Sequence, residues 1–111
     1  MIVYFIQGKS DNLVKIGICN NLKRRMIGLQ TGNPHPLRVL RQLDVMDHER
    51  LERDLHDRFK DFSVQGEWFN LSSGCRRWIK SLKNEDGKVI DCQYYYHAKD
   101  LSRHSLGEKI L

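Results

Sequence analysis

The sequence predicts one α/β (α+β) domain in which a small three-stranded antiparallel sheet is flanked by helices. The 111 residues, of which 40% are hydrophobic and 30% charged, are enough for one compact core. Two runs rich in β-forming residues, 2–6 and 13–18, enclose a stretch of Gly, Ser, Asp and Asn, which is typical of a β-hairpin. Beyond the hairpin, apolar residues recur at the spacing of amphipathic helices.

The hairpin comes first, and its register decides which side chains meet. If residues 8–11 form a four-residue loop, Phe5 pairs with Val14. Tyr4 then lies opposite Lys15, about 5 Å away on the same face of the sheet. A slip of one or two residues would change these partners, so the register stays open at this point.

A first helix follows the hairpin and leads into the third strand. Asn20 or Asn21 can cap this helix, and Gly32 ends it. Its apolar side chains share one face at i, i+4 and i+7: Leu22, Met26 and Leu29. Two prolines then break the chain, and residues 37–43 have the composition and alternation of a strand.

Two further helices are predicted in the second half of the chain. Asp47 caps the first of them, and a turn at residues 65–69 precedes the second, which Ser72 or Ser73 caps. The first has a buried stripe of Leu51, Leu55, Phe59 and Phe62. The second turns Cys75, Trp78, Ile79 and Leu82 inward and Arg76, Arg77, Lys80 and Lys83 outward.

The charge balance favours a polyanionic partner. Lys and Arg number 19 against 14 Asp and Glu, which gives a net charge of +5. Residues 37–74 nevertheless hold eight acidic and six basic side chains, so an acidic stretch lies between two basic ends. This stretch can hold a cation next to phosphates, or it is a solvated helix rich in both signs. The composition therefore predicts nucleic acid as the partner.

The sequence shows no sign of a membrane span or of export. No run approaches the roughly 18 apolar residues of a span, and the N-terminus lacks the pattern of a signal peptide. Cys19, Cys75 and Cys92 are odd in number and widely spaced, unlike a disulfide framework or a zinc site. We therefore expect a cytoplasmic protein with reduced thiols and no membrane partner.

Several short motifs then occur in a specific order. Val3-Tyr4-Phe5 lies on the first predicted strand, Lys15-Ile16-Gly17 on the second, and Arg25 on the helix that follows. With these motifs the chain resembles the GIY-YIG nuclease superfamily, which is named for two such tripeptides and has an arginine and a later glutamate after them. Residues 29–34, the pattern Leu51-Glu52-x-x-Leu55-His56-x-x-Phe59 and Gly66-Glu67-Trp68-Phe69 look like its small phage-associated branch.

This resemblance implies a fold, an activity and a cofactor. Residues 1–83 would form a GIY-YIG-like catalytic domain, and residues 84–111 a C-terminal extension with an added strand over 88–96 and a polar tail. The implied activity is hydrolysis of a DNA phosphodiester at one divalent cation, Mg²⁺ or Mn²⁺, in a bacterial or phage-infected cell. Double-stranded DNA, branched DNA and RNA remain open as substrates. Because Lys15 replaces the usual second tyrosine, a catalytically weak or inactive DNA- or RNA-binding module is the alternative.

The first two motifs and the helix arginine suit phosphodiester hydrolysis. Tyr4 is the candidate general base, and an ammonium at Lys15 would lower the phenol's pKa by favouring phenolate. At 100° per residue, Arg25 borders the buried face of its helix, where its planar donors can meet the scissile phosphate. Lys23 and Arg24 point away from that face and suit backbone phosphates. The alternatives are a packed tyrosine, an exposed lysine and a structural salt bridge.

The second helix supplies the candidate cation ligand. Glu52 offers the hard oxygen that Mg²⁺ or Mn²⁺ prefers, and the resemblance puts the superfamily's metal glutamate here. His56 lies one turn further on the same flank, where it can orient that carboxylate, contact the leaving group or pack. Glu67 is a supporting or alternative acid. On the last helix, Arg76, Arg77 and Lys80 are candidates for nucleic-acid binding. Tyr94, Tyr95 and Tyr96 can stack on bases or belong to a strand.

Overall fold

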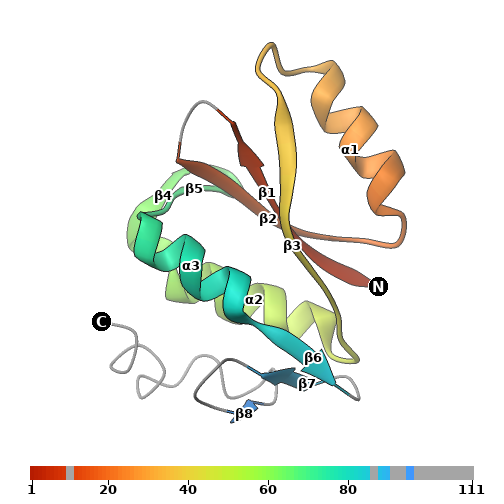
Figure 1. Cartoon of the computed structure of the whole chain (residues 1–111), viewed down its shortest axis with the longest axis vertical. Helices are drawn as coiled ribbons and strands as arrows, with labels where there is room; N and C mark the ends of the chain where they lie inside the picture. The colour runs from red at the N-terminus through yellow and green to blue at the C-terminus, as the bar shows by residue number, and fades with distance from the viewer. Residues whose placement is uncertain (10–11, 86–87, 91–94, 97–111) are drawn as a thin grey trace.

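A computed structural model describes residues 1–9, 12–85, 88–90 and 95–96 of the chain (Figure 1). Its elements are β1 (Ile2–Gly8), β2 (Leu13–Cys19), α1 (Leu22–Thr31), β3 (Leu37–Asp44), α2 (His48–Arg58), the 3-10 helix η1 (Lys60–Phe62), β4 (Ser63–Gln65), β5 (Trp68–Asn70), α3 (Ser73–Ser81), β6 (Lys83–Glu85), β7 (Lys88–Ile90) and β8 (Tyr95–Tyr96). No described helix has the length and apolar composition that crossing a bilayer requires.

The main sheet has five antiparallel strands rather than the predicted three. Their order is β3-β1-β2-β5-β4, so the three predicted strands lie side by side as expected. The additional strands β4 and β5 have three residues each and are joined at Gly66, whose φ of 57° suits glycine. Strands this short show no clear alternation, which is why the sequence indicated only a turn there.

A smaller antiparallel sheet contains β6, β7 and β8. Of the single strand predicted over 88–96, the structure describes two short pieces, β7 and β8, which pair with each other. Cys92 and Tyr94, together with the predicted polar tail over 97–111, lie outside the described residues.

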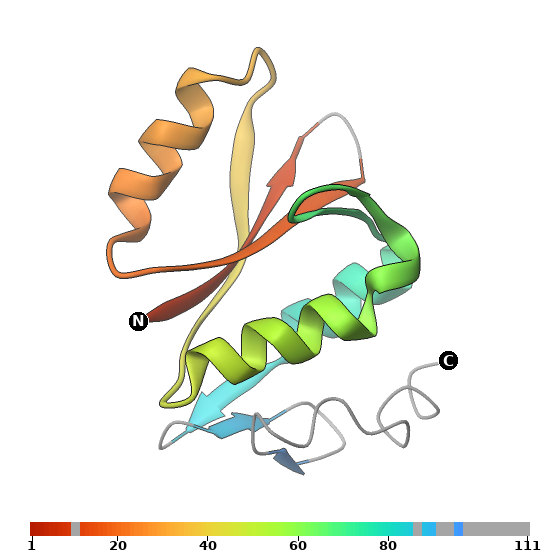
Figure 2. The same ribbon diagram turned by 180° about the vertical axis from the view of Figure 1, so that it is seen from behind.

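Helices cover both faces of the main sheet, as Figures 1 and 2 show from opposite sides. On one face, α1 packs its half-buried Leu22, Met26 and Leu29 onto a small cluster around Tyr4 and Ile6. On the other face, α2 and α3 contribute to the larger core, which includes Val3, Phe5, Val14, Ile16, Leu51, Leu55 and Ile79. The alternation of β1 therefore sends Tyr4 toward α1 and its neighbours Val3 and Phe5 toward α2 and α3.

The expected hairpin register is wrong by two residues. Phe5 pairs with Ile16, and Tyr4 lies opposite Gly17, while Lys15 lies opposite Ile6. β1 continues to Gly8, where it still pairs with β3 on its other edge, and Gln7 pairs with Val14, so the turn between β1 and β2 lies later in the sequence than the expected loop at 8–11. A shift of two residues keeps every side chain on its face. Lys15 is thus on the Tyr4 side of the sheet, but diagonal to Tyr4 rather than opposite it.

The helix caps agree only in part with the predicted ones. Asn21 caps α1, and its Oδ1 accepts a hydrogen bond from the Arg24 backbone N at 3.0 Å. Ser72 caps α3 by accepting from the Cys75 backbone N at 3.3 Å. Asp47 precedes α2, but its side chain makes no capping hydrogen bond.

The predicted buried stripe of the second helix is too long by one residue. Phe62 is 47% exposed, because α2 ends at Arg58 and the chain continues as η1. Leu51, Leu55 and Phe59 are buried as expected.

We predict that Gly17→Ala destabilises the fold. A Cβ at Gly17 would lie 2.5 Å from the Oη and 2.6 Å from the Cζ of Tyr4, so the buried ring would have to move. Such overpacking costs about 1–3 kcal/mol. The matched control is Gly28→Ala on α1, where a Cβ meets no atom within 4 Å and helix propensity should add up to about 1 kcal/mol. Urea unfolding midpoints measure both, and equal stabilities of the two variants would contradict the contact.

Candidate active site

Tyr4 is the buried centre of the site. Its side chain is 1% exposed, and its phenol ring lies across the backbone of Gly17 on the neighbouring strand. The β5 ladder pairs with β2 only at Leu13, Val14 and Lys15, and the Ile16 N then donates to the Glu67 carbonyl at 3.1 Å. The ring of Tyr4 is therefore directed over the part of β2 that lies beyond the β5 ladder.

α2 approaches β2 at this same place. The Nε2 of His56 lies 2.8 Å from the carbonyl oxygen of Ile16, and because a carbonyl can only accept, Nε2 is the donor. The imidazole also packs edge-on against Phe69, with ring centroids 4.9 Å apart. This hydrogen bond and ring contact fasten α2 to the sheet.

Glu52 lies one turn before His56 on α2 and faces a second acid. Its Oε2 is 4.0 Å from the His56 Nε2. Burial raises the pKa of Glu52; the charge of His56 opposes this, whereas the charge of Glu67 and a side-chain hydrogen bond with Glu67 raise the pKa further. The two carboxyl groups therefore lie against each other, although they are 15 residues apart in sequence.

The donor set at this point fits a divalent cation. Glu52, His56 and Glu67 each offer a ligand atom, and these atoms lie within 4.8 Å of one another. Two carboxyl groups this close, once deprotonated, supply the hard, negatively charged oxygen ligands that Mg²⁺ and Mn²⁺ prefer. Glu52 and Glu67 are the better candidates, because the Nε2 of His56 is engaged by the Ile16 carbonyl.

Lys15 has a different partner from the expected one. Its Nζ lies 3.1 Å from the Oε1 of Glu67 and 5.6 Å from the centroid of the Trp68 ring. The shifted register puts Lys15 directly across from Trp68 on β5, so the ammonium is held at the start of that strand. The expected direct pair of Lys15 and Tyr4 across the hairpin is therefore wrong.

The pKa of Tyr4 moves opposite to the expected direction. Burial raises it to about 12, and the charges of Glu67, Cys19 and Glu52 add to the increase. Arg25 is the group whose charge lowers it. The sequence indicated Lys15 for this role, because cross-strand pairing was assumed and the depth of burial was not visible.

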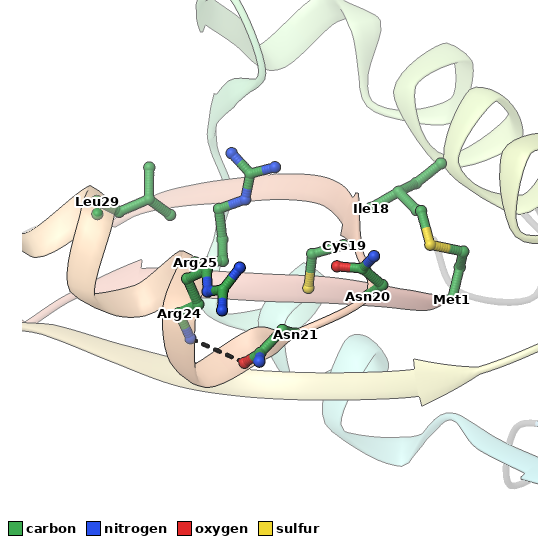
Figure 3. Close-up of a pocket in the computed structure, with 9 residues that line it drawn as sticks. Met1, Ile18, Cys19, Asn20, Asn21, Arg24, Arg25 and Leu29 are labelled. Atoms are coloured by element: carbon green, nitrogen blue, oxygen red, sulfur yellow. Dashed lines mark hydrogen bonds between the residues drawn. The ribbon is translucent and has the colours of Figure 1, made fainter.

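Arg25 belongs to α1, and its side chain is exposed. Together with Arg24, Asn20 and Asn21 it lines a pocket of about 560 Å³ beside Cys19. Figure 3 shows how these side chains lie around it. Because its charge acts on the Tyr4 phenol, the structure brings Arg25 and Tyr4 to one place, as the motif spacing predicted.

The predicted nucleic-acid-binding residues form two separate groups. Lys23 and Arg24 are exposed on α1, on the Tyr4 side of the sheet. Arg76, Arg77 and Lys80 are on α3, which covers the opposite face. The structure therefore brings Tyr4, Lys15, Arg25, Glu52, His56 and Glu67 together, but it does not add the α3 cations to them.

Two contributors to the site were not identified from sequence. Gly17 was noted only as a motif residue, yet its missing side chain makes room for the Tyr4 ring. The carbonyl of Ile16 is the partner of His56, and no sequence pattern predicts a contact between a side chain and a distant backbone oxygen. The pairing of Tyr4 with a glycine would have indicated this contact, but it becomes visible only when the hairpin is given its correct register.

A family model of the T5orf172 domain matches residues 1–85. This segment contains every residue of the candidate site and all five strands of the main sheet. No curated protein and no solved structure matches the chain.

We predict that the Tyr4 phenol titrates near pH 12 in the metal-free protein. The difference in absorbance at 295 nm between wild type and Tyr4→Phe should show this ionisation well above the usual value of 10. Arg25→Gln should move the midpoint higher because it removes the opposing charge, whereas Arg24→Gln should not. Circular dichroism at each pH checks that the chain is folded. A midpoint at or below pH 10 would contradict the predicted rise of the Tyr4 pKa by burial.

The raised pKa also sets a direction for stability. The unfolded chain loses the Tyr4 proton near pH 10, whereas the folded chain holds it to about pH 12. Between these values the folded state binds more protons, so the contribution of Tyr4 to the free energy of unfolding is lost as the pH rises. Tyr4→Phe should lack this part of the decline.

Proposed function

The chain belongs to the T5orf172 domain family, a phage-associated family, and from this premise we propose that it is a metal-dependent DNA endonuclease. The observation that carries the proposal is the convergence on Tyr4. Arg25 from α1, Glu52 from α2 and Glu67 from the turn before β5 are all close enough to change the pKa of its phenol. Perturbed ionisable groups gathered from separate elements are typical of a catalytic site.

Tyr4 is the proposed general base. Its phenolate would take a proton from a water molecule, whose oxygen then bonds to phosphorus while the bond to the 3′ oxygen breaks. With a pKa of about 12, roughly one phenol in 10⁵ is ionised at pH 7. Positive charge at the site is therefore needed to lower the pKa, and among the described residues Arg25 supplies it.

Glu52 is the proposed ligand of Mg²⁺ or Mn²⁺, with Glu67 as its partner or as the alternative acid. A divalent cation bound there would stabilise the negative charge that develops on the phosphate oxygens. His56 holds the position of Glu52 by fixing α2 to β2 through the Ile16 carbonyl. Arg25 would bind the scissile phosphate through its planar donors, and Lys23 and Arg24 would contact the backbone beside it.

Lys15 acts on Tyr4 indirectly in this scheme. The carboxylate of Glu67 raises the pKa of Tyr4, and the Lys15 ammonium, 3.1 Å from that carboxylate, offsets its charge. The lysine at the second tripeptide thus favours the phenolate by neutralising an acid rather than by touching the phenol.

A nucleic-acid-binding module without turnover is the second candidate. The raised pKa of Tyr4 favours it, because a phenol that stays protonated at neutral pH is a poor base. Incubation of plasmid with the purified chain and Mg²⁺ or Mn²⁺, next to a chelated control, separates the two: nicks or cuts that need the cation support the nuclease, and binding without cleavage supports the module.

We predict that Glu52→Gln abolishes cleavage and leaves DNA affinity nearly unchanged. The variant removes a ligand charge with little change in bulk and no loss of a phosphate contact. Asp57→Asn is the matched control, because its carboxylate is on the same helix but 61% exposed. Plasmid cleavage measures activity, and fluorescence anisotropy with chelator measures binding. Undiminished cation-dependent cleavage by Glu52→Gln would assign the cation to Glu67 instead.

We predict that Lys15→Met shifts the rising limb of the cleavage rate to higher pH. Without the ammonium, the charge of Glu67 acts unopposed on Tyr4 and raises its pKa, so activity at neutral pH falls. Lys15→Met combined with Glu67→Gln should move the limb back, because the acid is then also neutral. Single-turnover rates against pH decide this. An unmoved pH profile with weaker binding would mean that Lys15 only contacts phosphate, and an active Tyr4→Phe enzyme would disprove the general base.

A further inference from the structure

A second basic pocket lies on the face of the sheet that α3 covers. It has a volume of about 240 Å³, and its lining includes four cationic side chains from β3 and α3: Arg38, Arg76, Arg77 and Lys80. Among the described residues that line it, none is acidic. Arg38 was not among the residues that the sequence analysis predicted to bind nucleic acid, because β3 and α3 are adjacent only in the fold.

Two of the guanidinium groups are held by neutral partners. The Nη2 of Arg38 donates to the Oε1 of Gln7 at 3.0 Å, and Gln7 itself is buried. The Nη1 of Arg76 donates to the Oδ1 of Asn12. An amide oxygen orients a guanidinium without cancelling its charge, so these positive charges remain available to an anion.

The first turn of α3 adds to the positive potential. Ser73 lines the pocket, and no acidic residue occurs in that turn. The partial positive charge of a helix N-terminus favours anions, and it reinforces the four cations here.

This pocket is separate from the candidate active site. Gln7 and Arg38 pair across β1 and β3 at the hairpin end of the sheet, whereas the pocket that Arg25 lines reaches Cys19 at the opposite end of β2. The side chain of Gln7 also alternates away from that of Tyr4, toward the helices α2 and α3. A phosphate bound beside Arg25 cannot also contact Arg38.

We infer that the pocket of Arg38, Arg76, Arg77 and Lys80 is a second nucleic-acid site that binds a backbone phosphate away from the scissile one. Fork-shaped guanidinium donors match the oxygens of a phosphate. The other residues that line the pocket are uncharged, so the four cations leave a charge of +4 for an anion to balance. The inference rests on the proposed function in one respect, namely that the polyanion is the DNA on which the chain acts.

The test measures DNA binding without cleavage. In a Glu52→Gln background with chelator, anisotropy of a labelled duplex is followed over a salt series for Arg77→Gln/Lys80→Gln and for Arg38→Gln. The matched control is Arg53→Gln/Lys60→Gln, which removes two exposed charges from α2 and the residues after it. Circular dichroism and urea midpoints confirm that each variant folds.

The double α3 variant should bind roughly tenfold more weakly, and its salt slope should fall by up to about 1.8, or about 0.9 for each lost phosphate contact. Arg38→Gln should lower the slope by up to about 0.9. The control should keep the wild-type slope. Equal slopes for all variants, or no DNA binding by the parent chain, overturn the inference. If these losses occur while the wild-type chain fails to cut plasmid with Mg²⁺ or Mn²⁺, the second site stands and the nuclease proposal fails.

Discussion

The contact between the Tyr4 ring and the backbone of Gly17 is the constraint on which the candidate site depends. Only a residue without a side chain leaves room for a buried tyrosine to cross a neighbouring strand at this distance. The crossing aims the phenol beyond the β5 ladder, where α1, α2 and the turn before β5 can all approach it. A side chain at position 17 would move the ring and with it the point on which the other groups converge.

A second contact places the acids at that point. The hydrogen bond from His56 to the Ile16 carbonyl fixes α2 to the residue next to Gly17, so Glu52, one turn earlier, comes to the same place. The Ile16 N donates to the carbonyl of Glu67, which brings the second acid there as well. Both backbone groups of one residue, Ile16, therefore help to bring the two carboxylates to one place.

Local patterns could be predicted from the sequence, whereas distant pairings could not. The helices and the hairpin depend on periodicity and composition, which a sequence displays directly. The resemblance to the GIY-YIG superfamily indicated Tyr4, Arg25 and Glu52. The register depends on β3, which pairs with β1 as far as Gly8, and β3 is 29 residues further along the chain. The Lys15 partner depends in turn on β5, a three-residue strand with no pattern of its own. The pKa of Tyr4 depends on its burial by residues from several segments of the chain, and no single segment shows this burial.

Acidic and basic side chains of the site act in opposite directions on the pKa of Tyr4. Burial raises the pKa of the Tyr4 phenol, and the charges of Glu52 and Glu67, the two acids that suit a cation, raise it further. Arg25 acts against this from one side, and Lys15 acts against Glu67 from the other. A cation between Glu52 and Glu67 would offset the negative charge of these two acids on Tyr4. The same acids that suppress ionisation of the base in the protein alone are therefore the groups that would attract the charge needed to release it.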